Sequence, residues 1–237
     1  MNKKNKVRIL GLTLARGGSK SVLRKNIKLI AGIPLIGYTI KEALKSSFIT
    51  RYIVSTDDEE IQKVAIACGA DAPFLRPNEF STDEASSVSA MQHAVDWAEK
   101  DEGVKYDYIV ELMCTNPMKS VEDIDASIEK LISTQADSVI AVHQLEDHHP
   151  ARIKKIVDDK IVDFCITEIP ESRRQDLRPE AYIRSGSIYA LKRDYLMDEG
   201  KRYGSDNSRP YILPQERAVN IDTEIDFMIA ELMLNNK

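Results

Sequence analysis

Short apolar runs alternate along this chain with longer segments in which apolar residues recur every three or four positions. Residues 7–15 form the first run, and they predict a buried strand that ends in a loop at Arg16-Gly17-Gly18. Residues 34–47 show the spacing of an amphipathic helix. The same criteria predict further strands at 52–55, 108–114, 138–142 and 182–191, and further helices between Asp57 and Gly69 and at 85–100, 121–134 and 223–234.

Alternating strands and helices indicate repeated βαβ units. Such units build an α/β fold with a mostly parallel central sheet and helices on both faces. The alternation breaks after His143, where 152–157 and 160–164 predict a short hairpin around Asp158-Asp159. We therefore expect one domain, 1–237, with an insertion at 144–182 that leaves the sheet.

Composition narrows the class of protein. With 237 residues, of which 43% are hydrophobic and 30% charged, the chain has the profile of an ordinary globular protein. A net charge of −5 argues against a nucleic-acid-binding protein. No apolar stretch approaches the roughly 20 residues that span a bilayer, and the chain begins with a polar segment, so we expect a cytoplasmic protein without membrane contact. The three cysteines are widely separated and predict neither disulfides nor a zinc site.

The loop after the first strand carries the first candidate chemistry. In an open α/β sheet, ligands bind beyond the carboxyl ends of strands. Gly17 and Gly18 allow backbone N–H groups to approach a phosphate, and four cations surround them, which suggests a bound polyanion: Arg16, Lys20, Arg24 and Lys25. A solvated basic loop explains the composition equally well. The chain has neither a GxxxxGK[ST] nor a GxGxxG motif, which argues against a P-loop NTPase and a dinucleotide-dependent dehydrogenase.

Several motifs in order resemble those of the acylneuraminate (CMP-sialic acid) cytidylyltransferase family, whose signature opens with a strand, then A-R-x-x-S-K and K-N. The matching segments run over nearly the whole chain: Ala15-Arg16-Gly17-Gly18-Ser19-Lys20, Lys25-Asn26, Gly32-Ile33-Pro34-Leu35, Val54-Ser55-Thr56-Asp57, Leu75-Arg76-Pro77-Asn78-Glu79, Asp83-Glu84-Ala85-Ser86-Ser87 and Asn220-Ile221-Asp222-Thr223-Glu224-Ile225-Asp226. The resemblance implies a Rossmann-like nucleotidyltransferase fold. It also implies attack by the anomeric hydroxyl of a nonulosonic (sialic-acid-like) sugar acid on the α-phosphate of CTP, with release of pyrophosphate.

The resemblance assigns the nucleotide side of the site. Arg16 and Lys20 would hold the triphosphate, where negative charge spreads over the phosphoryl oxygens during transfer. Arg76 and Ser87 match positions near the cytosine and ribose, although Ser87 alone would be read as a helix-surface serine. The remaining residues of this site would be Gly17, Gly18, Ser19, Lys25 and Asn26.

The resemblance also implies a Mg²⁺ ion as cofactor, with Asp222 as its ligand. Mg²⁺ favours one or two carboxylates together with phosphates and water. An aspartate before a helix is more often an N-cap, and only the matching sequence context favours metal binding. Asn220 stands where these enzymes often have a second aspartate. We expect Asn220 either to ligate the metal through oxygen or to support Asp222.

The sugar side departs from the family pattern. The typical Leu-Gln-Pro-Thr-Ser-Pro-Leu-Arg is Leu112-Met113-Cys114-Thr115-Asn116-Pro117-Met118-Lys119 here, so Met113 replaces a glutamine that would bind the sugar. The accepted sugar would then differ from N-acetylneuraminate near that contact, as legionaminic or pseudaminic acid do. The other positions matched to sugar binding are Arg152, Arg174 (or its neighbour Arg173), Gln175 and Ser185, which replaces asparagine. The arginines are equally explained by a solvated polar segment.

A homodimer is implied as well, because 144–182 matches the region through which these enzymes exchange contacts and complete the partner's sugar pocket. Two other readings stay open from the sequence. One is a related sugar nucleotidyltransferase that uses another NTP or an eight-carbon ulosonate, and the other is an inactive nucleotide-binding homologue.

Overall fold

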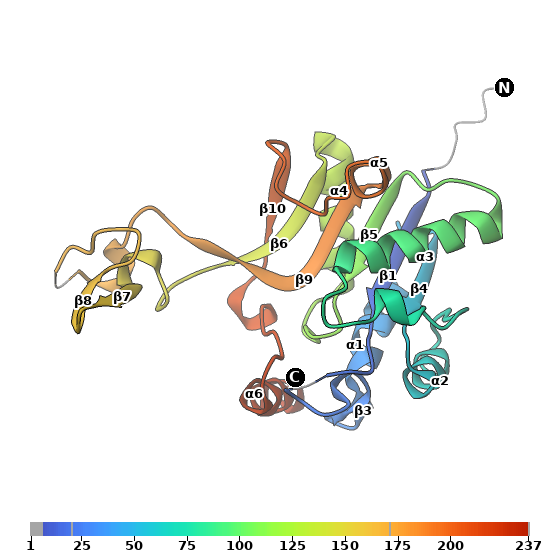
Figure 1. The fold of residues 1–237 in the computed structure, drawn as a ribbon, viewed down its shortest axis with the longest axis horizontal. Coiled ribbons are helices and arrows are strands. Elements are labelled where there is room, and N and C mark those ends of the chain that lie inside the picture. Colours follow the sequence, from blue (N-terminus) through green and yellow to red (C-terminus); the bar gives the residue numbers. More distant parts are fainter. Residues whose placement is uncertain (1–6, 20, 171, 237) are drawn as a thin grey trace.

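The computed structural model describes residues 7–19, 21–170 and 172–236. Its centre is a six-stranded sheet (Figure 1). In sheet order the strands are β10 (Ser208–Ile212), β6 (Ser138–Gln144), β9 (Tyr182–Lys192), β5 (Tyr108–Leu112), β1 (Ile9–Leu14) and β4 (Arg51–Ser55).

The sheet is mostly parallel, as the alternation of elements predicts. The pairs β1–β4, β1–β5 and β10–β6 are parallel, whereas β9 runs antiparallel to both of its neighbours, β5 and β6. Two details differ from the prediction. The apolar pattern of β9 does not indicate the direction of the strand. The strand β10 was not predicted because it is a short, largely exposed edge strand that contains Pro210.

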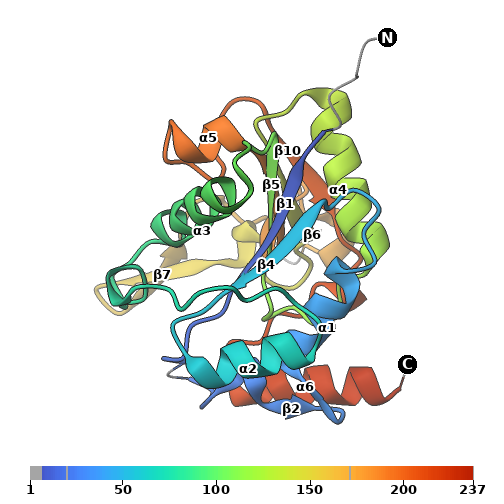
Figure 2. The same ribbon diagram turned by 90° about the vertical axis from the view of Figure 1, so that its right-hand side faces the viewer.

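Helices cover both faces of the sheet, which confirms the predicted α/β class (Figure 2). One face packs against α1 (Leu35–Ala43), α2 (Glu59–Ala67) and α4 (Val121–Thr134), and the other against α3 (Ser87–Glu102) and the short α5 (Arg193–Met197). Adjacent strand residues divide between these layers, as Ile9 and Leu10 of β1 do, because successive side chains of a strand point to opposite faces.

A third, smaller cluster fixes the loop after β1 to the end of the chain. Val22 and Ile30 pack with Ile221 and with Phe227 of α6 (Glu224–Asn235). The two-residue strands β2 (Leu29–Ile30) and β3 (Ile33–Pro34) pair beside it. This packing brings residues about 200 positions apart in sequence to one edge of the sheet, which is where the candidate site lies.

Between β6 and β9 the chain leaves the sheet (Figure 1). The excursion contains the hairpin of β7 (Lys154–Val157) and β8 (Lys160–Asp163), with Asp158 and Asp159 at positive φ in its turn. Several of its apolar side chains face solvent, among them Ile156 at 77% and Ile161 at 76% exposure. Short 3₁₀ turns complete the chain at Lys25–Ile27, Asn78–Phe80, Pro150–Arg152, Arg174–Asp176 and Gln215–Arg217.

Within the described part of the chain, no helix is both long enough and apolar enough to cross a membrane.

Candidate functional site

Two adjoining pockets lie beyond the carboxyl ends of β1 and β5, of about 370 and 340 Å³. They share Leu14, Arg16 and Met113, so together they form one groove. The first is also lined by Arg76, Phe80, Ser81, Thr82, Asp83, Ala85, Ser86, Ser87, Ala90 and Glu111, and the second by Ser19, Ser21, Lys25, Asn26, Cys114, Thr115 and Asp222. Most residues predicted for nucleotide binding thus meet in this groove, at the edge where an open α/β sheet binds ligands.

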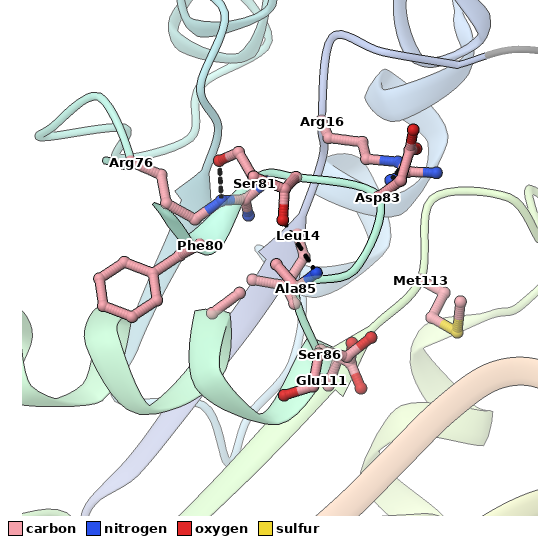
Figure 3. A pocket seen from close by; sticks show the side chains of 13 residues that line it. Leu14, Arg16, Arg76, Phe80, Ser81, Asp83, Ala85, Ser86, Glu111 and Met113 are labelled. Carbon is pink, nitrogen blue, oxygen red and sulfur yellow. Dashed lines mark hydrogen bonds and ion pairs between the residues drawn. The ribbon is translucent and has the colours of Figure 1, made fainter. Parts of the chain in front are cut away.

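Arg76 forms a cationic wall of the first pocket (Figure 3). Its Nε donates to Ser81 Oγ at 2.9 Å and its Nη1 to the Ser55 carbonyl at 3.2 Å, and only 5% of the residue is exposed. Burial lowers the pKa of this guanidinium from its ordinary value, with Asp57 opposing the shift. The side chain is held in place by the protein before any ligand arrives, which reduces the cost of ordering it on binding.

The N-terminus of α3 borders the same pocket. The Ser86 side chain caps the helix by accepting from Ser89 N at 3.0 Å, and Ser87 is its first residue. Both serines line the pocket. The start of a helix adds backbone donors beside Ser87 at the wall of this pocket.

The two glycines of the loop after β1 play different parts. Neither has a positive φ. Gly17 donates its N–H to Asp57 Oδ1 at 3.0 Å, and a Cβ added to it would lie 2.8 Å from Asp58 Oδ2 and 3.0 Å from Asp58 Cβ. A Cβ on Gly18 would meet nothing within 4 Å. Close packing against the start of α2 therefore requires glycine at position 17, whereas position 18 has room for a side chain. Neither glycine lines the two pockets.

The described cations of this loop do not converge on one point. Lys20 lies outside the described residues. Arg24 turns toward α2 and pairs with Asp58 and Glu60, and these hydrogen bonds and charges hold its pKa above the ordinary value. Arg16 and Lys25 do line the groove. Arg24 is thus engaged away from the groove. Arg16, which pairs with Asp83 at 3.1 Å, and Lys25 are the described loop cations that line the groove.

Lys25 and Asn26 are buried beneath the second pocket. Lys25 Nζ donates to the Ile221 carbonyl at 2.7 Å and lies 3.6 Å from Asp222 Oδ1. Asn26 Nδ2 donates to the Arg16 carbonyl at 2.9 Å. These bonds tie the loop after β1 to the segment before α6 and set the position of Asp222 relative to the loop.

Asp222 places a largely exposed carboxylate at the wall of the second pocket. It lines the second pocket with a side chain that is 70% exposed, and Asn220 Nδ2 donates to its Oδ2 at 2.6 Å. Thr223, and not Asp222, caps α6. The N-cap alternative for Asp222 is therefore wrong, because Thr223 makes the capping box with Asp226.

Asn220 supports Asp222 instead of facing the groove. Its Oδ1 is buried and has no hydrogen-bond partner among the described residues. This oxygen packs against Gly186, where an added Cβ would lie 3.2 Å from it. The described residues contain no group of three or more His, Cys, Asp or Glu side chains that could hold a metal. A single exposed carboxylate fits Mg²⁺ if phosphate oxygens and water complete the shell, which is the arrangement that Mg²⁺ favours at nucleotide sites.

The residues predicted for sugar binding fall into two groups. Met113 lines both pockets. Ser185 is buried in β9, where its Oγ donates to the Ala141 carbonyl at 3.0 Å beside the irregularity in the β6–β9 pairing, and it lines neither pocket. Ser185 therefore stabilises the sheet, since its hydroxyl is already engaged.

The remaining predicted residues lie on the excursion. Arg174 Nη1 pairs with Glu146 at 2.9 Å and, like Gln175, lines a separate cavity of about 270 Å³ at the excursion's base. Arg152 Nη2 donates to the Ser172 carbonyl at 3.3 Å and its Nε lies 3.9 Å from Glu168. None of these three lines the groove of its own chain. Within one chain they cannot contact a ligand bound there.

Two buried charged residues near the groove were not predicted. Lys119 donates to Thr39 Oγ1, to the Met113 carbonyl and to the Asn116 carbonyl, and burial lowers its pKa to about 7. It fastens the loop after β5 that carries Met113. Glu111 lines the first pocket, and a lone carboxylate inside the apolar run 108–114 was the available signal for it.

Sequence comparisons relate the chain to a known protein family. A family model described as cytidylyltransferase matches residues 10–220. The pseudaminic acid cytidylyltransferase of Campylobacter jejuni subsp. jejuni serotype O:23/36 (strain 81-176) is 33% identical, over 92% of this chain and 93% of that protein. N-acylneuraminate cytidylyltransferase A of Danio rerio is 34% identical, over 94% of this chain and 50% of that protein.

Among solved structures, CMP:2-keto-3-deoxy-manno-octonic acid synthetase complexed with CTP is similar in fold. It has a TM-score of 0.71 and 18% sequence identity, and the likeness covers 97% of this chain and 99% of that one.

Proposed function

The chain belongs to the cytidylyltransferase family, and we propose that it transfers CMP from CTP to the anomeric hydroxyl of a nonulosonic sugar acid, releasing pyrophosphate. The observation that carries this proposal is the continuous groove, in which Arg76 and Ser87 line one part and Lys25 and Asp222 the other. A nucleoside triphosphate also has two parts, a base with its ribose and a polyanionic tail.

Each half of the groove suits one half of the nucleotide. Arg76 and Ser87 offer hydrogen-bond donors beside the apolar side chain of Leu14, which suits a base and its ribose. Arg16 and Lys25 supply positive charge beside Ser19, which suits the phosphates. The α-phosphate would then lie near Arg16 and Met113, which are shared by both pockets.

The negative charge that develops on the phosphoryl oxygens sets the demands on the protein. Fixed cations in the groove stabilise that charge without having to reorganise during the reaction. Arg16 and Lys25 line the groove and are proposed to contact the phosphates. Lys20, assigned from the sequence resemblance, is proposed to act with them. A Mg²⁺ ion bound by Asp222 would neutralise phosphate charge further. The hydrogen bond from Asn220 orients the carboxylate for that task.

The sugar acid is proposed to bind beside Met113. A thioether accepts hydrogen bonds poorly, so this position favours an apolar part of the sugar over a hydroxyl. Deoxy, acylamino nonulosonic acids such as pseudaminic and legionaminic acid fit this requirement better than a more hydroxylated sugar. The relative from Campylobacter jejuni that carries the name of pseudaminic acid supports the same choice.

A second copy of the chain is proposed to complete the sugar site. The excursion exposes apolar side chains that a monomer leaves in water, including Phe164 at 59% and Ile169 at 76%. It also carries Arg152 and Arg174, whose guanidinium groups suit the sugar carboxylate. In a homodimer, the excursion of one copy would bring these arginines to the groove of the other.

The test is a steady-state assay of pyrophosphate release with purified protein, Mg²⁺, a panel of nucleoside triphosphates and a panel of sugar acids. The sugar panel contains pseudaminic, N,N′-diacetyllegionaminic and N-acetylneuraminic acids and an eight-carbon ulosonate. We expect turnover with CTP and a nonulosonic acid. A strong preference for GTP or UTP, or turnover with the eight-carbon acid alone, would contradict the proposal.

The metal assignment has its own test. Asp222→Asn keeps the shape of the side chain and removes the charge, so we expect the Mg²⁺ concentration that gives half-maximal rate to rise by about tenfold or more, with the melting temperature unchanged. Direct Mn²⁺ binding in the presence of a nonhydrolysable CTP analogue, followed by electron paramagnetic resonance, gives a readout independent of turnover. Unchanged metal dependence in this variant would show that the ion is held elsewhere.

A further inference from the structure

Glu111 is a carboxylate buried at the wall of the first pocket. Only 2% of the residue is exposed, yet it lines the pocket. Glu111 lies near the end of β5, and Met113, which directly follows that strand, lines the same pocket. In Figure 3, Arg76 and Phe80 lie on one side of the pocket and Met113 on the other, with Glu111 between them.

One oxygen of Glu111 is fixed by an ion pair. Arg202 Nη1 donates to Glu111 Oε2 at 2.6 Å. The guanidinium of Arg202 stacks over the ring of Tyr189, 4.3 Å from its centroid, and over Tyr203 at 5.7 Å. Tyr189 is also the register partner of Glu111 across β5 and β9. The carboxylate is therefore held in one orientation by packing from two strands and the loop after α5.

The other oxygen, Oε1, accepts no hydrogen bond from the described residues, and it is not among the fully buried atoms that lack a partner. It is therefore open to the pocket. Burial raises the pKa of Glu111, and the charge and hydrogen bond of Arg202 oppose that rise. Removing an ion from water without a full set of hydrogen bonds is unfavourable, so a ligand that donates to Oε1 would supply what the protein leaves out.

The substrates themselves limit what can sit there. CTP and a sugar acid are both anions, and neither a phosphate nor a carboxylate would be placed beside a second carboxylate. The group that meets Oε1 must therefore be a neutral donor, such as a hydroxyl or an amide N–H.

We propose that Glu111 is a specificity-determining residue, whose Oε1 accepts a hydrogen bond from a hydroxyl or amide N–H of the sugar acid bound beside Met113, with Arg202 as its positioning residue. This inference rests on the proposed function. Glu111 lines the first pocket, which also holds the proposed base and ribose donors Arg76 and Ser87. The sugar is favoured as its partner because Glu111 is two positions before Met113 on one stretch of chain, while Arg76 and Ser87 come from other elements. A nearby acceptor discriminates strongly among ligands, since a sugar that lacks the donor leaves a buried acceptor unpaired.

The experiment compares two variants with the wild-type protein. In Glu111→Gln, the side-chain oxygen still accepts the hydrogen bond from Arg202, so the amide NH₂ group faces the pocket. This NH₂ group is a donor and cannot accept the hydrogen bond from the sugar. The double variant Glu111→Leu/Arg202→Met replaces the whole pair with apolar side chains, which avoids leaving a buried charge unpaired and commonly preserves stability. Melting temperature reports folding for both.

The control is Glu99→Gln, which alters a largely buried ion pair away from the groove. Arg193 donates to both Glu99 oxygens, at 2.8 and 2.9 Å, and neither residue lines the groove. Any general effect of weakening a buried ion pair should appear in this variant too.

We expect KM for the preferred nonulosonic acid to rise by about 10- to 100-fold in both Glu111 variants. KM for CTP should stay within about twofold, and Glu99→Gln should leave both constants unchanged. Synthetic analogues of the preferred sugar, each lacking one hydroxyl or carrying an N-methylated amide, identify the donor, because one of them should lose its sensitivity to Glu111→Gln.

Two other results would overturn the inference. An unchanged sugar KM in folded variants shows that Oε1 contacts no substrate, and a rise in CTP KM of the same size shows that Glu111 contacts the nucleotide. Both results leave the proposed function standing. If the wild-type protein turns over no nonulosonic acid with CTP, the proposed function fails and this inference fails with it.

Discussion

Gly17 and Gly18 are adjacent glycines in a predicted phosphate loop, and the structure predicts opposite responses to alanine at these two positions. A Cβ on Gly17 would lie 2.8 Å from Asp58 Oδ2 and 3.0 Å from Asp58 Cβ. Ordinary contacts between carbon atoms are about 3.5–4.0 Å, so Asp58 must move by about 0.5 Å or more. The same methyl on Gly18 would enter open space.

Asp58 cannot move without loss, because it holds the start of α2. Its Oδ1 accepts from Glu60 N and Ile61 N, both at 2.9 Å, and its carboxylate pairs with Arg24. Displacing an N-cap costs about 1 kcal/mol, and overpacking a tight contact costs about 1–3 kcal/mol. We therefore expect Gly17→Ala to lower the free energy of unfolding by about 1–3 kcal/mol, and the melting temperature by roughly 2–12 °C for a chain of this size.

The assay is thermal and urea unfolding of Gly17→Ala and Gly18→Ala, together with KM for CTP. Gly18→Ala should be within about 0.5 kcal/mol of the wild-type protein, because it is a substitution without steric conflict. Equal destabilisation by the two variants would refute the packing argument for Gly17. A rise in CTP KM in Gly18→Ala alone would show that phosphate approaches the backbone at Gly18, as the sequence suggested for both glycines.

Three further outcomes follow from buried or paired charges. The pKa of Lys119 is lowered from 10.5 to about 7 by burial, so between these pH values the unfolded chain binds a proton that the folded chain lacks. In that window the free energy of unfolding of the wild-type protein should rise with pH by up to about 1.4 kcal/mol per pH unit more than that of Lys119→Met. Urea titrations of both proteins at several pH values measure this, and the same pH dependence in both would contradict it. Asp123→Ala should lower the free energy of unfolding in urea by about 3–5 kcal/mol, because it leaves Arg217 without the carboxylate to which it donates two hydrogen bonds of 2.9 Å. A loss below about 1 kcal/mol would refute the role of this pair. Arg24→Gln should lower the free energy of unfolding and leave KM for CTP within about twofold of the wild-type value. A tenfold rise in KM for CTP would show instead that Arg24 contacts the phosphates.

Much of the fold follows from local patterns in the sequence. The spacing of Ile36 and Ile40 in α1, or the alternation along β1, depends only on the helix and strand periods, and these patterns predicted the α/β class. The direction of β9 was beyond such reasoning, because an apolar strand reads the same whether it pairs parallel or antiparallel. The edge strand β10 was missed for a related reason, since an exposed strand has little apolar signal.

The sequence by itself determined which chemistry the protein has available. The residues Arg16, Arg76 and Asp222 were identified from ordered motifs, because local sequence context is what a family resemblance records, and all three line the groove. The tertiary structure decided how other charges are used: it pairs Arg24 with α2, and it buries Lys119 and Glu111. These assignments depend on contacts between residues distant in sequence, such as Glu111 with Arg202, and only the folded chain brings such residues together.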